Sequence, residues 1–245
     1  MTATACLALC LTTLVNGRVQ TDYYHAYREA QRSGKMLVID FGTGFDFNTV
    51  DAKKLDGFVL CRVPVDYTIK TEGKQTRLID APAFDCLQKQ SGIVVVDLQE
   101  KTHFGETVSV LPQRYSAAGY VDALFDLPVG SITQRTLTWA FRVHQERPAC
   151  VQGVADLTLM QHADRQSTVQ AQSNSMFHSS NFPGSFEIVA QSGSGGGNLA
   201  DVAIELVNTW RGSAPHWGAA TTAWSSYGVD MQTNGGSWFA TGVFR

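Results

Sequence analysis

Three apolar runs restrict the fold of this chain more than any other feature. They read KMLVIDF (35–41), FVLCRVPVD (58–66) and IVVVDLQ (93–99). A strand that is covered on both faces needs no polar side, so each run predicts a buried strand. Segments of a different pattern separate the runs. This alternation of helix and strand predicts a three-layer α/β domain with a mixed sheet.

The helices expected in the first half have ordinary start and stop signals. Residues 22–34 form an amphipathic pattern that Gly34 closes as a C-cap. Residues 81–92 have Pro82 in the first turn and Gly92 after the end. The other expected elements are a short helix at 48–57, a weaker strand around 106–111 and a closing helix at 112–128.

The second half is predicted to hold three helices and a β-hairpin. The longest helix has a stripe of small or apolar residues at four-residue steps, which suits close packing: Leu159, Ala163, Ser167 and Ala171. The hairpin turn is expected at 233–236, between arms of alternating pattern. The helices are expected at 131–148, 157–178 and 199–210, and the hairpin at 225–244. The boundary between the halves is expected at Pro128–Ser131.

Composition and charge argue against two classes of partner. The 245 residues have a net charge of −3 with scattered Lys and Arg, whereas nucleic-acid-binding surfaces carry a basic stripe. After the N-terminus, no apolar run reaches the ~20 residues that cross a bilayer. The start, Ala3–Val15, is uncharged and mostly apolar. It has two interpretations: an export signal, so that residues 1–17 are removed, or the first element of the mature domain.

The five cysteines form no metal or redox motif. Cys6 and Cys10 fall in the N-terminal run, and Cys61, Cys86 and Cys150 are widely spaced with no CxxC. Cys61 lies in a strand-like run, where a buried thiol is the simplest interpretation. The chain is therefore not a disulfide scaffold.

Residues 18–130 resemble the thioredoxin-like fold in element order and in the run GKMLVIDFGTGF (34–45). The resemblance implies a reactive CxxC after the first buried strand and a cis-proline before the strand at 93–99. This chain has Thr43, Gly44, Phe45 and Asp46 at the first place and Ser91-Gly92-Ile93 at the second. Disulfide exchange needs two nearby sulfurs. We therefore expect a redox-inactive module, a spacer or a binder of a partner.

Four motifs follow one another in the second half: WAFRVHQERP, MFHSSNF, FEIVAQ and TWRGSAPHW. In this order, with the hairpin after them, they resemble the CAP superfamily in its bacterial form. This domain is shared by cysteine-rich secretory proteins, antigen 5 and pathogenesis-related 1 proteins. The resemblance implies an α-β-α sandwich over residues 131–245. The third motif departs from the family's G-E-N-I-A, with Phe186 for Gly and Ile188 for Asn.

The CAP resemblance implies a cleft formed by His178, Glu187 and His216, supported by Trp210 and Ser213. Two imidazoles and a carboxylate can hold Zn²⁺ or another divalent ion, or act as an acid–base pair. They can equally hydrogen-bond across a polar cleft. Many CAP domains have a second glutamate where this chain has Ser213, which puts a four-ligand site in doubt.

The remaining histidines, His25, His103 and His162, are expected to be surface or packing residues. The aromatic side chains of the last third have two interpretations. They fill the core of the sandwich, or some of them line a groove for a lipid or peptide.

The function that the resemblance implies is binding outside the cytoplasm. We expect a secreted or envelope protein whose CAP cleft recognises a small ligand, a lipid or a protein partner, joined to a non-catalytic thioredoxin-like module. The alternative is a metal-dependent hydrolase that acts through a water held by His178, Glu187 and His216. Only the alternative requires a cofactor, Zn²⁺ or another divalent ion. Neither interpretation fixes the ligand or the oligomeric state.

Overall fold

The chain divides into two compact units, which are described separately. The computed structural model describes residues 18–99, 102–193 and 197–245. Unit 1 ends at Asp126 and unit 2 spans Leu127–Arg245, whereas the sequence placed the boundary at Pro128–Ser131. The expected export segment, residues 1–17, lies outside the described residues. No helix in the described part of the chain is both long and apolar enough to cross a membrane.

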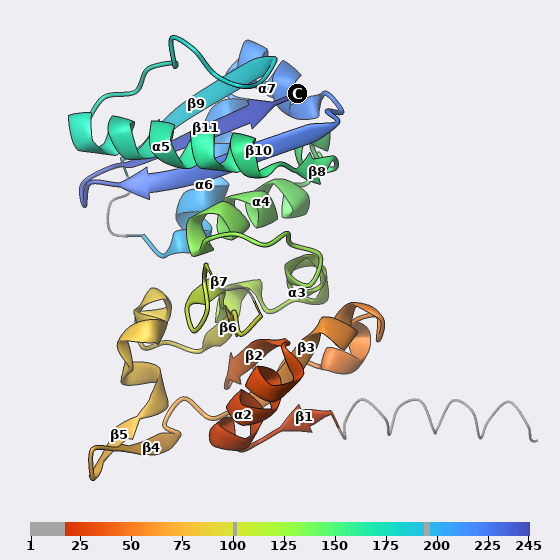
Figure 1. Ribbon diagram of the computed structural model, residues 1–245, viewed down its shortest axis with the longest axis vertical. Helices are drawn as coiled ribbons and strands as arrows, with labels where there is room; N and C mark the ends of the chain where they lie inside the picture. The colour runs from red at the N-terminus through yellow and green to blue at the C-terminus, as the bar shows by residue number, and fades with distance from the viewer. Residues whose placement is uncertain (1–17, 100–101, 194–196) are drawn as a thin grey trace, which may run out of the picture. The chain divides into compact units, whose positions relative to one another are not determined.

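Unit 1 is built on a mixed five-stranded sheet in the order β1-β3-β2-β6-β7 (Figure 1). Strands β1, β2 and β3 are parallel, β6 is antiparallel to β2, and β7 is antiparallel to β6. The bounds are β1 Val19–Gln20, β2 Met36–Phe41, β3 Phe58–Val63, β6 Gly92–Val96 and β7 Thr107–Pro112. The three apolar runs of the sequence are confirmed as strands, and every residue of β2 and β6 is buried.

Helix α2, Tyr23–Ser33, has the predicted ends. Asp22 accepts a hydrogen bond from the backbone of His25, and Gly34 adopts φ 59° as its C-cap. The helix predicted at 112–128 is shorter, because a 3₁₀ turn η5 (Gln113–Tyr115) precedes α3 (Ala118–Leu124).

The helices predicted at 48–57 and 81–92 are short 3₁₀ turns instead. In the first region Asp46 and Asp51 accept from the backbone N–H two residues on, which competes with an α-helix. The second region ends at Gln88 in a left-handed conformation. The turns are η1 Phe47–Thr49, η2 Lys54–Gly57, η3 Leu78–Asp80 and η4 Pro82–Leu87.

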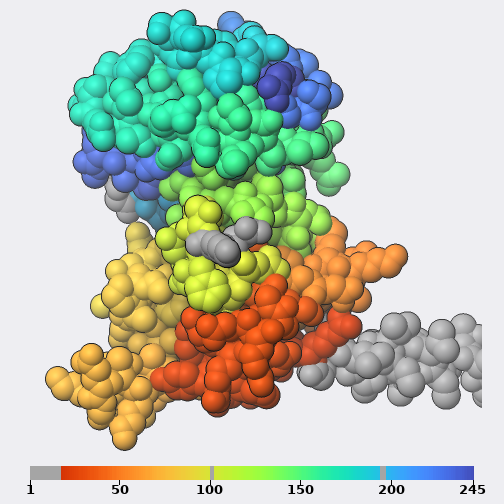
Figure 2. Space-filling view, viewed as in Figure 1, coloured from red at the N-terminus to blue at the C-terminus, as the bar shows by residue number. Residues whose placement is uncertain are grey.

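A β-hairpin that the sequence analysis did not predict lies between β3 and η3. Its strands are β4 (Thr68–Thr71) and β5 (Lys74–Arg77), which pair only with each other. The two residues between them, Glu72 and Gly73, have positive φ, as a tight hairpin turn requires. Figure 2 shows the hairpin, in orange-yellow, projecting from the body of unit 1.

Unit 2 has a four-stranded sheet in the order β8-β10-β11-β9, covered by helices on both faces. Helix α5 packs against β10 and β11, while α4 packs on β10 and α6 on β9. Figure 1 shows α5 in front of this sheet and α7 behind it. The strands are β8 Val154–Ala155, β9 Phe186–Ser192, β10 Ser226–Thr233 and β11 Trp238–Phe244. The predicted hairpin is thus confirmed as β10 and β11.

The helices of unit 2 begin and end at identifiable caps. Helix α4, Ile132–Val143, starts with a capping box of Ser131 and Gln134. Helix α5, Leu157–Ser173, ends earlier than predicted because Asn174 turns left-handed. Gly228 lets α5 approach β10 closely, since a Cβ there would lie 2.1 Å from the backbone of Leu159. The other two are α6, Leu199–Arg211, and α7, Ala214–Thr221.

Candidate functional site

The candidate site of unit 2 is built around Glu187, a carboxylate buried in the sheet. Glu187 lies on β9 opposite Val243 of β11, and its side chain is only 1% exposed. A carboxylate in such a place is costly unless hydrogen-bond donors satisfy it. The partners of Glu187 therefore decide what the site can do.

Four donor positions converge on the two oxygens of Glu187. Ser179 donates its backbone N–H to Oε2 at 2.7 Å and its hydroxyl to Oε1 at 2.6 Å. Nδ1 of His178 lies 3.1 Å from Oε2, and Nε2 of His162 lies 3.3 Å from Oε1. Each oxygen has two partners, which satisfies the buried carboxylate by side chains and backbone alone.

His162 belongs to this cluster, so its interpretation as a surface or packing residue was incomplete. It lies on α5, its side chain is 12% exposed, and its Nε2 is also 3.1 Å from Oγ of Ser179. One signal was present in the sequence. His162 directly precedes Ala163 of the buried stripe and therefore borders the face of α5 that packs on the sheet.

Two buried amides hold the segment that carries His178 and Ser179. Nε2 of Gln166 and Nε2 of Gln170, one turn apart on α5, both donate to the carbonyl of Phe177, at 2.8 and 2.6 Å. This segment begins after Asn174, whose left-handed backbone ends α5. The sequence analysis had instead extended the helix to residue 178. These contacts explain how His178 reaches Glu187 from outside the helix.

His216 reaches the cluster through His178. The centroids of the two imidazole rings are 5.8 Å apart and the rings are tilted by 45°. Burial, and next the charge of His178, lower the pKa of His216 below its usual value. The structure thus brings His178 and Glu187 into contact, and places His216 beside His178.

The arrangement does not fit the metal site that the sequence suggested for His178, Glu187 and His216. Both oxygens of Glu187 are occupied by donors, and Nδ1 of His178 is directed at Oε2. A divalent ion would have to displace these contacts in order to bind. Among the residues that the structure describes, no group of three or more His, Cys, Asp or Glu side chains could hold a metal ion.

Ser179 is hydrogen-bonded in a way that opposes a nucleophilic role. Its hydroxyl hydrogen is donated to Oε1 of Glu187, and Nε2 of His162 faces the same two oxygen atoms. A catalytic serine instead donates its hydroxyl to a base that takes the proton. The hydrogen bonds therefore hold the polar side chains in place and do not activate the Ser179 hydroxyl as a nucleophile.

The two residues expected to support the cleft have different places. Trp210 is fully buried and stacks on Phe141 at 5.3 Å, so it packs α6 against α4 in the core. Ser213 precedes α7, and its carbonyl accepts from the backbone of Trp217 in the first turn. Ser213 therefore begins the helix that carries His216.

A hollow of about 410 Å³ lies beside the Glu187 cluster on the outer side of α5. The cation of Arg165 and two exposed apolar side chains, Val169 and Phe177, give the hollow a mixed character. In the described part of the chain Arg165 makes no ion pair with a carboxylate. The lining residues are His162, Arg165, Gln166, Val169, Phe177, Ser179, Ser180 and Asn181.

In unit 1 the segment where the thioredoxin resemblance implied a CxxC, Thr43–Asp46, is a loop held by Asp40. This buried carboxylate accepts from the backbone and the hydroxyl of Thr43 at 2.8 and 2.7 Å, and from Nε of Arg62 at 2.8 Å. Arg62 also donates to the carbonyl of Phe45. Gly44 has φ 72°, and Asp46 caps the following 3₁₀ turn. These contacts give the loop a structural role.

The described cysteines do not supply the chemistry that this loop lacks. Cys61, Cys86 and Cys150 are free thiols, and burial raises the pKa of Cys61 and of Cys86 to about 12. Thiol–disulfide exchange depends on the thiolate, which such groups do not form near neutral pH.

Comparison of the chain with protein-family models, with curated proteins and with solved structures finds no match.

Proposed function

We propose that this is a binding protein with two units in one chain: a redox-inactive thioredoxin-like first unit, and a CAP-type second unit that takes a small ligand. The covered sheet of unit 2 and the mixed sheet of unit 1 support these two folds. The CAP resemblance also favours export to the envelope or the medium. The observation that carries the proposal is the hollow beside His162 and Ser179, with the guanidinium of Arg165 in its lining.

The lining of the hollow favours a ligand with an anionic head and a short apolar part. A guanidinium without a carboxylate partner attracts a carboxylate or phosphate group. The hydroxyl of Ser180 and the amide of Asn181 can add neutral hydrogen bonds, while Val169 and Phe177 offer an apolar wall. The volume lies within the ~300–1,000 Å³ of small-molecule sites.

The alternative function, a metal-dependent hydrolase, has less support. It needs Glu187 to bind an ion or a water, but Oε1 and Oε2 each already have two partners. Elemental analysis that found one metal per chain, lost in a His216→Ala variant, would favour the hydrolase over the binding protein.

Octanoate is a suitable probe because it combines a carboxylate with a short apolar chain. We expect calorimetry on the full chain to show saturable octanoate binding, at least tenfold weaker binding of 1-octanol, and a similar loss in Arg165→Gln. Arg147→Gln, at an exposed arginine outside the hollow, is the matched control and is expected to bind as the unaltered chain does. Equal binding of octanol and octanoate, or full binding by Arg165→Gln, would contradict the proposal.

A further inference from the structure

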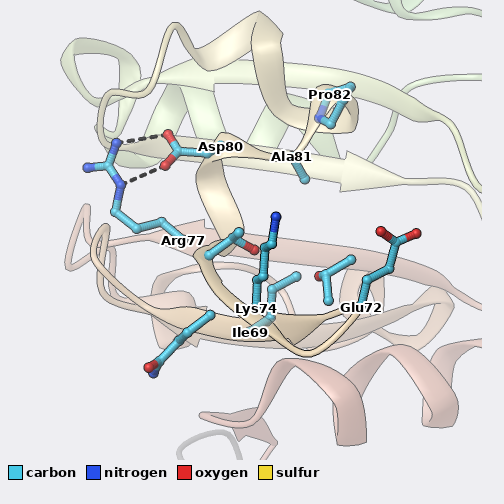
Figure 3. A pocket seen from close by; sticks show the side chains of 10 residues that line it. Ile69, Glu72, Lys74, Arg77, Asp80, Ala81 and Pro82 are labelled. Carbon is cyan, nitrogen blue, oxygen red and sulfur yellow. Dashed lines mark hydrogen bonds and ion pairs between the residues drawn. The ribbon is translucent and has the colours of Figure 1, made fainter.

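Two hairpin turns of this chain contain a glycine, and the side chains beside those glycines are arranged differently. In the β4–β5 turn, Glu72 points across a hollow of about 640 Å³ toward the segment Asp80–Pro82 (Figure 3). In the β10–β11 turn, Asn234 precedes Gly235, and its side chain folds back on the backbone of the turn. The amide group of Asn234 is therefore held against the peptide groups that follow it.

The side-chain oxygen of Asn234 accepts two backbone hydrogen bonds. The N–H of Gly236 donates to Oδ1 at 3.0 Å, and the N–H of Ser237 donates to it at 2.9 Å. Two N–H donors on a carbonyl oxygen stabilise the negative charge that this oxygen takes when a nucleophile adds to the carbonyl carbon. The carbon Cγ of Asn234 is therefore polarised for attack.

The backbone nitrogen of Gly235 is the nucleophile adjacent to this carbon. Its attack on Cγ closes a five-membered succinimide ring, and glycine has no side chain to obstruct the closure. The N–H of Gly235 is directed at Oγ1 of Thr233, at 3.0 Å. The hydroxyl of Thr233 in turn donates to the carbonyl of Ser237 at 2.9 Å. This hydroxyl is thus placed to pass the proton of Gly235 to water as the ring closes.

The sequence and the exposure of the turn single out this asparagine. Among the asparagines that the structure describes, only Asn234 is followed by glycine. Asn234 and Gly235 are both exposed, so water reaches the site.

The nitrogen that would leave also joins the turn to helix α5. Nδ2 of Asn234 donates to Oδ1 of Asn174 at 2.9 Å. Asn174 is the left-handed residue that ends α5, and the segment that carries His178 and Ser179 follows it. A carboxylate oxygen in place of Nδ2 cannot donate, so the bond between the turn and α5 would be lost.

We propose that Asn234 is a self-modification site that converts to aspartate and isoaspartate with release of ammonia. In the first step, the nitrogen of Gly235 bonds to Cγ of Asn234 while its proton passes through the Thr233 hydroxyl to water. The bond between Cγ and Nδ2 then breaks, and Nδ2 takes a proton from water and leaves as ammonia.

The second step consumes one water molecule. Water adds to one of the two carbonyl carbons of the succinimide and opens the ring. Opening at one carbonyl gives aspartate, and opening at the other gives isoaspartate, in which the backbone runs through the former side chain. Both products carry a carboxylate and release the contact with Asn174. The inference does not depend on the ligand proposed for unit 2.

The first test incubates the full chain at mildly alkaline pH and follows residue 234 by peptide mass spectrometry, with and without urea. We expect aspartate and isoaspartate to accumulate at Asn234 in the folded chain. Thr233→Val keeps a β-branched side chain but lacks the hydroxyl, so conversion should be about tenfold slower in the folded chain and unchanged in urea. Thr209→Val, the same change at an exposed position of α6, is the control and should convert as the unaltered chain does.

The second test uses Asn234→Asp, which imitates one product. Amide exchange at Asn174 and Ser175, whose N–H groups close the end of α5, should become faster. Asn208→Asp, at an exposed position of α6, is the control and should leave this exchange unchanged.

Three results would overturn the proposal. One is the absence of conversion at Asn234 in the folded chain. Another is a Thr233→Val variant that converts at the unaltered rate when folded, or that is slowed as much in urea as in the folded chain. The last is unchanged exchange at Ser175 in Asn234→Asp, because the modification would then not release α5 from the turn.

Discussion

Unit 1 and unit 2 each bury a carboxylate on a strand, and the two carboxylates differ in one kind of partner. Asp40 and Glu187 both accept a backbone N–H and a hydroxyl from a nearby residue, Thr43 and Ser179 respectively. The remaining partner of Asp40 is the guanidinium of Arg62, whereas Glu187 faces two imidazoles.

This difference separates a structural carboxylate from a candidate site. A guanidinium keeps its charge at all pH values met by a protein, so the loop at Thr43–Asp46 is held permanently. An imidazole can donate or accept through its two ring nitrogens and can exchange partners. His178 is also 52% exposed, which lets solvent or a ligand reach the edge of the cluster.

The largest effect is expected from Arg62→Met in unit 1. The substitution leaves the buried carboxylate of Asp40 without its cation, and breaking such a pair costs about 3–5 kcal/mol of unfolding free energy. Amide exchange in β2 and β3 measures this loss. Arg245→Met breaks a more exposed pair with Asp156 and should cost under about 1 kcal/mol. Equal losses in the two variants would contradict the role given to Arg62.

A third buried carboxylate, Asp230 of β10, sharpens the comparison because its hydrogen-bond donors are all neutral. Thr133, Ser167 and Gln232 donate to it at 2.6, 2.9 and 2.9 Å. Burial, which these bonds offset only in part, raises the pKa of Asp230 from 3.8 to about 6. The folded chain therefore holds this proton more tightly than the unfolded chain does.

Asp230→Asn is accordingly expected to change how stability depends on pH. In the unaltered chain, the protonated Asp230 side chain stabilises the fold fully below pH ~4. This stabilisation is lost as the pH rises to ~6, so that the free energy of unfolding falls by roughly 3 kcal/mol. The variant should lack this fall. Urea unfolding at pH 4 and pH 7 measures it through the five tryptophans, all of which lie in unit 2. A variant with the same fall would show that Asp230 is not its source. Glu205→Gln, at an exposed position of α6, is the control.

The smallest of the three effects is expected from Glu187→Gln. The substitution replaces one carboxylate oxygen of Glu187 by an NH₂ group, which cannot accept the hydrogen bonds that now reach that position. We expect this to lower the free energy of unfolding by about 2 kcal/mol. Tryptophan fluorescence during urea unfolding measures the loss, and amide exchange at Ser179 should become faster. Glu205→Gln, at an exposed position of α6, is the control. An unchanged exchange rate at Ser179 would show that Glu187 does not hold the segment.

The strands were the part of the fold most readily predicted. An apolar run such as that at 35–41 is readily interpreted as a strand. Because a strand buried on both faces is apolar throughout, its prediction does not depend on an alternation of apolar and polar residues. The helix predicted at 48–57 was wrong because local side-chain bonds from residues such as Asp46 compete with helix formation. The helix predicted at 81–92 was wrong because the region forms a 3₁₀ turn that ends where Gln88 turns left-handed. The β4–β5 hairpin has almost no apolar residues, so no hydrophobic pattern marks it.

The candidate site was predicted in part. Motif order pointed to His178 and Glu187, which the structure brings to 3.1 Å. His162 was missed because its contact with Glu187 spans 25 residues and depends on how α5 packs on the sheet. Trp210 could not be told from a cleft residue, because its burial against Phe141 is a tertiary feature.

The most direct test of the central claim, that ligand chemistry resides at the Glu187 cluster and not at the Asp40 loop, is an NMR chemical-shift map of the full chain during octanoate addition. We predict saturable shifts in the backbone amides of Ser179 and Ser180 and in the Arg165 side chain, with none at Thr43–Asp46. Shifts confined to Thr43–Asp46, or no shift at Ser179 and Ser180 at the highest octanoate concentration, would contradict the claim.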